Sequence, residues 1–379
     1  MTDTEGSPSA VDAESLALAA GAAAFVLLGV VGFLAIGGEP VPLSGRGSVG
    51  DIAAAGSAVL GAAAVVVGLI RRRRSRPAPS RAGGKARDVF DIAALAIAHA
   101  CVLLIGTLAL FSLLQRSFLG AVLYPFAGAV IAGTAGAASV YFAYLSAVQM
   151  NIYRLATLLA LFLSMGVIAS MLTAEDPLWW QKNLSALGMG DDVSGFAFNF
   201  TLILAGFLVT VVASYATKQL EIAALGKSAR SRRRVRLLQG GLVLMGILLA
   251  CVGLFPVDEN LAVHNTVASG MVTVYAALII GIRRLVPPIS PAFVALGFVF
   301  LGVIVVAGVA FAQGYYNLTA TELIAACLIF AWLIILIRNL GAVDADRLDE
   351  TRAPHPRYRR TDTAGQPVTA PADGAAASS

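Results

Sequence analysis

The sequence has little charge and few of the residues from which catalytic and metal sites are usually built. Asp, Glu, Lys and Arg make up 13% of its 379 residues, about half the share typical of soluble domains. It holds only three cysteines and three histidines. Cys101, Cys251 and Cys327 lie inside apolar stretches without a CxxC spacing, so neither a disulfide framework nor a metal site is indicated. We therefore expect no cofactor and no bound metal.

Long hydrophobic stretches are the most prominent feature of the sequence. Hydrophobic residues make up 58% of the chain, and its mean hydropathy is +0.82. Ten stretches are long enough to cross the roughly 30 Å hydrocarbon core of a bilayer as helices. Backbone groups cannot stay unpaired in lipid and no stretch alternates with period two, so an all-α integral membrane protein is predicted. The predicted helices are residues 15–37, 50–70, 89–114, 119–146, 153–173, 196–215, 237–255, 266–282, 289–312 and 321–338.

Basic residues are distributed very unevenly among the connections between these helices. If the N-terminus is cytoplasmic, 24 of the 27 Lys and Arg residues fall on the cytoplasmic side, and only Arg46, Arg116 and Lys182 fall outside. The positive-inside rule then predicts a multi-pass protein of the plasma membrane with both termini cytoplasmic. The clusters RRRRSR (71–76) and RSRRRVR (230–236) are interpreted first as topology anchors. They could also contact anionic headgroups at about 1 kcal/mol per charge.

The predicted helices divide into two groups of different character. Residues 15–146 form an Ala- and Gly-rich four-helix region. Residues 150–340 form a six-helix membrane domain that we expect to fold without the first group. The tails, residues 1–14 and 341–379, lack an apolar period and are predicted to be disordered and cytoplasmic.

The four-helix region has two notable features. Gly128, Ala132 and Gly136 are four residues apart, a spacing that lets two helix backbones approach closely. His99 is an ionisable residue at membrane depth, which makes it a functional candidate by default. The alternative for His99 is a neutral imidazole that hydrogen-bonds to a neighbouring helix.

Polar side chains are concentrated in two predicted outer loops of the six-helix domain, residues 174–195 and 256–265. Trp179 and Trp180 are expected at headgroup level, where amphipathic rings are enriched. His264 stands at a predicted helix start, where the helix dipole favours a neutral ring. The candidate pocket residues are Asn183, Ser185, Gly188, Asp191, Asp192, Asn199, Pro256, Asp258, His264 and Asn265.

Several of these side chains have expected local roles. Asp258, Asp191 or Asp192 could bond the His264 ring and fix its tautomer, and Asn265 or Thr266 could cap the helix that follows. Asn199 lies one turn into a predicted helix, on a face that could look back at the first loop. Gly188 and Gly190 permit a tight turn before the two aspartates.

The same loops carry a resemblance to a known family. The pattern consists of an N-x-S-x-x-G element and then an F-P turn that leads to a histidine, here Asn183, Ser185, Gly188, Phe255, Pro256 and His264. In order and spacing it resembles a prokaryotic six-helix membrane family, the domain of unknown function nine-nine-eight, and it is distantly similar to the eukaryotic Frag/DRAM/Sfk group. The resemblance covers roughly residues 150–340. It implies a six-helix membrane fold and, through the eukaryotic group, an association with lipid handling.

Three classes of function are weighed. The favoured class is non-catalytic recognition or organisation of membrane lipid in an outward-facing polar pocket, with Lys182 for a phosphate. An alternative is a lipid hydrolase or acyl-transfer enzyme that uses His264 with Asp258, Asp191 or Ser185, although no nucleophile-elbow sequence surrounds the serine. A small-molecule transporter is disfavoured, because His99 is the one ionisable residue predicted at mid-membrane depth and the sequence has no GxxxxGK[ST] loop.

A purely structural interpretation also stays open, in which Ser185, Asp258 and His264 do no more than pin the two loops together. Asn, Asp and Ser side chains commonly satisfy loop backbone in this way. The expected partners are membrane lipids, with other membrane proteins as further candidates. No nucleic-acid partner is expected.

Overall fold

A computed structural model describes residues 10–75, 84–224, 228–286 and 289–352. Within them ten helices are long and apolar enough to cross a membrane, which confirms the predicted all-α multi-pass class. The helices are α1 (Ala10–Ile36), α2 (Val49–Ser75), α3 (Gly84–Ser117), α4 (Pro125–Val148), α5 (Ile152–Thr173), α6 (Val193–Ala224), α7 (Ala229–Leu254), α8 (Val257–Leu285), α9 (Pro291–Ala312) and α10 (Leu318–Arg352). The shorter elements are 3-10 helices η1 (Trp179–Gln181) and η2 (Leu184–Gly188), and strands β1 (Val41–Pro42) and β2 (Val122–Leu123), which pair antiparallel.

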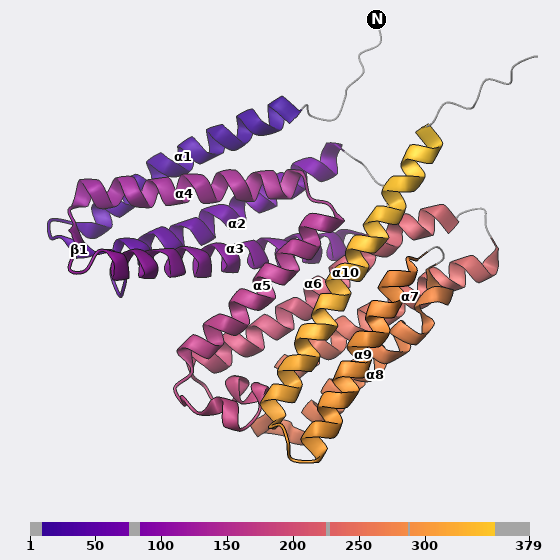
Figure 1. Ribbon diagram of the computed structural model, residues 1–379. Helices are drawn as coiled ribbons and strands as arrows, with labels where there is room; N and C mark the ends of the chain where they lie inside the picture. The colour runs from indigo at the N-terminus through magenta and orange to yellow at the C-terminus, as the bar shows by residue number, and fades with distance from the viewer. Residues whose placement is uncertain (1–9, 76–83, 225–227, 287–288, 353–379) are drawn as a thin grey trace, which may run out of the picture.

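Helices α1–α4 form one group, at the upper left of Figure 1, in which α4 packs along both α1 and α2. A Cβ atom placed on Gly128 would lie 2.5 Å from Ile36 Cδ1, and one on Gly136 would lie 2.7 Å from Leu28 Cδ2. Ala132 between them is fully buried. The small residues therefore let α4 approach α1 closely, as their four-residue spacing predicted.

Helices α5–α10 form the second group (Figure 1). Each helix contacts the next along the chain, and α10 contacts α5, so the six helices close into a ring. Tyr275 of α8 and Trp332 of α10 are fully buried with ring centroids 5.3 Å apart, and Phe293 of α9 stacks on Trp332. Between α6 and α7 the backbones nearly touch, because a Cβ atom on Gly246 would lie 2.6 Å from the Gly206 carbonyl oxygen. Aromatic side chains thus fill the contact among α8, α9 and α10, and glycines allow α6 and α7 to pack closely.

The two groups meet along α3, which contacts both α5 and α6. Phe90 of α3 stands edge-on to Phe207 of α6, with ring centroids 5.1 Å apart. A Cβ atom on Gly106 of α3 would be in ordinary contact with Met165 of α5, 3.4 Å from its Cε. One cluster of buried apolar side chains continues from α1 to α10. The four-helix group therefore packs beside the ring through apolar contacts.

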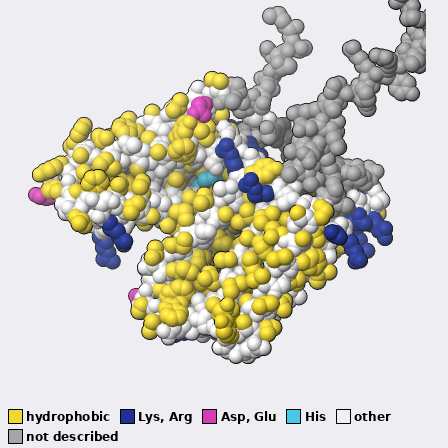
Figure 2. Space-filling view, in the orientation of Figure 1, with side chains coloured by type: hydrophobic (Ala, Val, Ile, Leu, Met, Phe, Trp, Pro, Cys, Tyr) yellow, Lys and Arg dark blue, Asp and Glu magenta, His cyan; other side chains and the backbone are white. Residues whose placement is uncertain are grey.

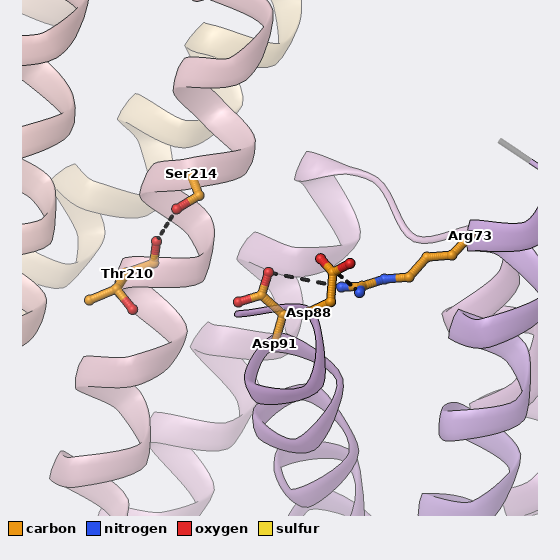
Figure 3. Close-up of polar contacts among 5 residues, drawn as sticks. All are labelled: Arg73, Asp88, Asp91, Thr210 and Ser214. Atoms are coloured by element: carbon orange, nitrogen blue, oxygen red, sulfur yellow. Dashed lines mark hydrogen bonds and ion pairs between the residues drawn. The ribbon is translucent and has the colours of Figure 1, made fainter. Parts of the chain in front are cut away.

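A small ionic cluster lies near the start of α3. Arg73 of α2 pairs with Asp88 at 2.8 Å and approaches Asp91 at 4.0 Å. Figure 3 shows the arginine reaching toward both carboxylates, beside the part of α6 that carries Thr210 and Ser214. The Arg73 and Asp88 side chains are 30% and 58% exposed, and an ion pair this exposed adds little stability.

Two helices extend into segments that the sequence predicted to be disordered. α1 begins at Ala10 and α10 ends at Arg352, so residues 10–14 and 341–352 are helical. The prediction was wrong there because Ala, Leu, Glu and Arg are strong helix formers, and extending an existing transmembrane helix needs no new nucleation. The other residues of both predicted tails lie outside the described part of the chain.

The surface of the protein is largely apolar. Figure 2 shows hydrophobic side chains over most of the visible face, with Lys and Arg side chains gathered in a few patches. Phe126, Leu172 and Ile280, from three different helices, are each more than 60% exposed. Apolar surface of this extent is covered by lipid or protein, which agrees with a multi-pass integral membrane protein.

Candidate functional site

The segment between α5 and α6, residues 174–192, is called the α5–α6 loop below. It contains η1 and η2 and lies at the lower end of the six-helix ring in Figure 1, near the starts of α8 and α10. Hydrogen bonds from side chains of α6, α8 and α10 hold it, and this set of contacts, made by Asn199, Asp258, His264 and Glu322, is called the clasp below. The structure thus brings together the two stretches that the sequence analysis singled out.

His264 of α8 is the centre of the contact between these stretches. Its Nε2 lies 3.0 Å from Ser185 Oγ on η2, and its Nδ1 lies 2.8 Å from the carbonyl oxygen of Phe255 at the end of α7. A carbonyl can only accept, so in the neutral ring Nδ1 carries the proton and Nε2 accepts from the Ser185 hydroxyl. His264 is 4% exposed and Ser185 is 9% exposed. The expectation that an aspartate would fix the tautomer was wrong, because a backbone carbonyl does so.

The stretch predicted as a loop over residues 256–265 is mostly the beginning of α8. Pro256 precedes the first turn, and the helix is interrupted at Asn260, where φ is −152° and ψ is 79°. The Asn260 side chain then accepts a hydrogen bond from the amide of Val263 at 3.1 Å. Asn260 therefore caps the main part of α8, in place of the predicted Asn265 or Thr266, and His264 follows four residues later.

A second set of contacts fixes the end of the α5–α6 loop. Asn199 of α6 donates from Nδ2 to the Gly188 carbonyl at 2.8 Å, as its predicted position suggested. Position 188 has no room for a side chain, since a Cβ atom there would lie 2.8 Å from Phe198 Cδ1. Gly190 has a φ of +78°, and its amide donates to Asp258 Oδ2 at 3.0 Å. Asp258 thus binds backbone of the loop instead of the histidine ring.

Glu322, which lies one turn into α10, was not among the residues predicted from the sequence. Its Oε2 accepts a hydrogen bond from the amide of Leu184 at 2.6 Å, and the amide of Ser185 also interacts with the carboxylate. This carboxylate satisfies free amides at the start of η2. A single acidic residue near the end of an otherwise apolar span was the available signal. The side chain of Asn317, at the start of α10, also donates to the Trp180 carbonyl at 3.0 Å.

A cavity of about 470 Å³ opens beside the clasped loop. Its lining residues are Ala174, Glu175, Asp176, Trp179, Lys182, Ala186, Leu187, Met189, Gly190, Asp191, Asp192 and Ser194. Of the predicted pocket residues, Asp191 and Asp192 line this cavity. The others lie outside its lining, elsewhere in the α5–α6 loop, on α6 or at the start of α8: Asn183, Ser185, Gly188, Asn199, Pro256, Asp258, His264 and Asn265.

The cavity lining contains four carboxylates and one amine. Lys182 Nζ lies 2.9 Å from Asp176 Oδ2, and its hydrogen bond lowers the pKa of Asp176, assisted by the amide of Leu178. Asp192 Oδ1 accepts from the Gly195 amide at 2.6 Å, at the start of α6. Glu175 and Asp191 are exposed. The cavity is therefore acidic overall, with one cation at its edge.

The arrangement required by a catalytic triad is not formed. A Ser-His-Asp triad places the carboxylate on the histidine Nδ1, whereas His264 Nδ1 bonds to Phe255 and Asp258 bonds to Gly190. Burial of Ser185 and His264 also limits access by a substrate. Among the described residues, no group of three His, Cys, Asp or Glu side chains is placed to hold a metal ion.

Three other candidates lie apart from the cavity. The Asn183 Oδ1 atom is buried and has no hydrogen-bond partner within the described part of the chain, and Asn265 is exposed on α8. His99 lies in the other group, where Nδ1 is 2.7 Å from the Leu95 carbonyl and Nε2 is 3.0 Å from Ser146 Oγ on α4. Its geometry fits the interpretation of a ring bonded to a neighbouring helix.

Residues 155–339 match the model of a family described as Protein of unknown function (DUF998). The match extends from the first turn of α5 almost to the end of the α10 span, so it includes the clasp and the cavity. It confirms the family resemblance, and the similarity to the Frag/DRAM/Sfk group stays a prediction. The chain matches no curated protein and no solved structure.

Proposed function

The chain belongs, over residues 155–339, to the DUF998 family, whose description names no activity, and we propose that this domain recognises membrane lipid without altering it. The headgroup would enter the cavity of the α5–α6 loop. The observation that carries the proposal is a cavity with charges of both signs, built on a clasped loop at the ends of membrane helices. Trp179 in its lining and Trp180, 49% exposed, suit the headgroup level.

The charges of the cavity favour a headgroup with an amine beside its phosphate. Glu175 and Asp191 can accept hydrogen bonds from a primary ammonium group. Lys182 lies at the same cavity and can approach a phosphate when it leaves Asp176, since both side chains are about half exposed. Four carboxylates against one amine make a purely anionic headgroup a poorer match.

The clasp supports binding and not turnover. Both ring nitrogens of His264 already form hydrogen bonds, one to the Ser185 hydroxyl and one to the Phe255 carbonyl. Proton transfer at Nδ1 would break the bond to Phe255, which joins the end of α7 to α8. The clasp instead fixes the loop that forms the cavity walls, and a preorganised wall lowers the entropic cost of binding. The enzyme alternative relies on His264 and Ser185, and neither of them lines the cavity.

The proposal is tested by lipid binding to the purified full-length protein. Native mass spectrometry would compare phosphatidylethanolamine with phosphatidylcholine, which has the same charge but no ammonium hydrogens to donate. We expect phosphatidylethanolamine to be retained preferentially. The variant Glu175→Gln/Asp191→Asn should lose this preference, because its cavity no longer holds the two carboxylates proposed to accept hydrogen bonds from the ammonium group.

A matched control removes the same charge elsewhere on the predicted outer side. Glu39 and Glu259 are both exposed and outside the cavity lining, so Glu39→Gln/Glu259→Gln should keep the preference. Equal behaviour of the two double variants, or no preference in the unmodified protein, would refute the proposal. Lipid products that appear with the unmodified protein and vanish in His264→Ala would establish the enzyme alternative.

A further inference from the structure

A second hollow lies between α7 and α8, at the opposite end of these helices from the clasp. It has a volume of about 840 Å³. Its lining residues are Arg230, Arg234, Leu237, Gly241, Leu244, Val274, Ala277, Leu278, Gly281, Arg284 and Leu285. Arg284 and His264 are 20 residues apart on α8, or about 30 Å along a helix. This groove is therefore separate from the cavity of the α5–α6 loop.

The spacing of its residues explains how the groove forms. On α7 the lining positions recur at intervals of three and four residues from Arg230 to Leu244, which places them on one helix face. Position 241 brings the helices together, since a Cβ atom on Gly241 would lie 2.7 Å from Leu278 Cδ2. Gly281 has a more open position, where a Cβ atom would meet only Leu285 in ordinary contact, at 3.5 Å. The result is an apolar trough with three arginines at one end.

The lining of the groove has cations and no carboxylate. Within the described residues, Arg230, Arg234 and Arg284 form no ion pair. Three guanidinium groups that line one groove repel one another unless an anion lies between them, and guanidinium binds phosphate oxygens in a bidentate way. Leu237 and Leu244, below the arginines, are 53% and 44% exposed. An occupant should therefore have an anionic head and a long apolar tail.

We infer that the α7–α8 groove binds an anionic phospholipid of the leaflet that faces the arginine ends of these helices. The phosphate lies among the three arginines, and an acyl chain lies along Gly241, Leu244 and Gly281. Basic pockets between transmembrane helices are suited to such headgroups, which the cytoplasmic leaflet supplies. A free phosphate would leave the apolar trough unused, so the lipid is the better match. This site gives the RSRRRVR segment a role beyond anchoring topology.

The chain offers a matched set of arginines for the test. Arg232, Arg233 and Arg283 are exposed and do not line the groove, yet they lie on the same two helix ends. The groove variant Arg230→Gln/Arg234→Gln/Arg284→Gln and the control Arg232→Gln/Arg233→Gln/Arg283→Gln each remove two charges from α7 and one from α8. Binding of phosphatidylglycerol and of phosphatidylcholine to the full-length protein would be measured by native mass spectrometry in neutral detergent.

We expect the groove variant to bind phosphatidylglycerol about tenfold or more weakly, and the control to stay within about twofold of the unmodified protein. Gly281→Leu, which fills the trough with a good helix former, should weaken phosphatidylglycerol binding with all arginines intact. Excess inorganic phosphate should displace little lipid. Equal loss in both triple variants, no effect of Gly281→Leu, or full displacement by phosphate would overturn the inference. Thermal unfolding of each variant checks that it is folded, and Gly281→Leu still tests the groove if the triple groove variant does not fold.

Discussion

The hydroxyl of Ser185 on η2 donates to Nε2 of His264 on α8, across 79 residues of sequence. The other ring nitrogen bonds to the carbonyl of Phe255, the residue that follows α7. One buried imidazole thus ties the α5–α6 loop to two helices. Glu322 and Asp258 hold the amides of Leu184 and Gly190 on either side of it. The loop is therefore anchored along its length to the helices that follow it in sequence.

The first prediction concerns this pair. Ser185→Ala leaves Nε2 of a buried ring without its partner, which costs about 1–3 kcal/mol, so the apparent thermal midpoint should fall. His264→Ala should cost at least as much, and the double variant should cost less than the sum because the two groups act on each other. Ser269→Ala, at an exposed position on α8, serves as the control and should change little.

The same variants separate two roles of the clasp. If it supports the cavity, phosphatidylethanolamine binding should weaken along with hydrogen-exchange protection of residues 184–190, while protection of α6 and α7 persists. Complete unfolding of both single variants would indicate that the pair serves only to pin the structure. Unchanged stability and exchange would show that the Ser185–His264 bond contributes nothing.

The second prediction concerns the contact of α6 with α7. A Cβ atom on Gly246 would lie 2.6 Å from the Gly206 carbonyl, so Gly246→Ala forces the two helices apart. We expect a clear loss of thermal stability, of the order of 1–3 kcal/mol for overpacking. Gly302→Ala on α9 is the matched control, because nothing lies within 4 Å of its Cβ position. A midpoint at or above that of the unmodified protein is expected there, and an equal loss at both glycines would contradict the packing argument.

The third prediction is the orientation in the membrane, on which the proposed outer position of the cavity depends. Reporter fusions at residues 80, 183, 225, 260 and 350 should read in, out, in, out and in, since 24 of the 27 basic residues then face the cytoplasm. Positions 183 and 260 flank the clasp, so they must read alike. An inverted result at 225 or 260 would place the cavity on the other side and remove the argument for an outer-leaflet lipid.

The fourth prediction concerns His99. Its ring bonds to Ser146 on α4 and to the Leu95 carbonyl, so His99→Leu removes a polar contact and leaves the Ser146 hydroxyl to find another acceptor. Interhelical hydrogen bonds in membranes average about 0.6 kcal/mol, and a correspondingly small fall in thermal midpoint is expected. Lipid binding at the α5–α6 loop should not change. Its loss at normal protein abundance would move His99 into the functional site.

Much of this architecture could be predicted from sequence because lipid imposes a simple rule on the backbone. Apolar length predicted all ten spans, and the spacing of Gly128, Ala132 and Gly136 predicted the close packing of α4. The helix ends were harder, since water permits both helix and coil there. Asn260 illustrates the difficulty, because it caps α8 only through a local break in the helix.

The site was only partly predictable for a different reason. Ser185 and His264 were recognised by their polarity in an apolar chain, but apolar helices reveal no inward face by periodicity. No sequence pattern therefore indicated that Glu322 of α10 would lie against Leu184, or that Asp258 would bind an amide instead of the ring. The cavity was likewise expected between two loops, whereas its lining comes from the α5–α6 loop and Ser194 at the start of α6.

The last prediction is that the six-helix ring folds without α1–α4. A chain that begins near Asn151 keeps the cap of α5, because the Asn151 side chain accepts from the amide of Arg154 at 2.9 Å. Without α3, this shorter chain exposes Phe207 of α6 and Met165 of α5. In a bilayer, lipid chains can cover these apolar side chains at a small cost in free energy. The truncated protein should therefore insert, remain monodisperse in detergent and keep its phosphatidylethanolamine preference. A chain that begins at Val193 is the control, since it lacks α5 and the clasped loop and should aggregate. Aggregation of both, beside a well-behaved full-length protein, would mean that all ten helices form one folding unit.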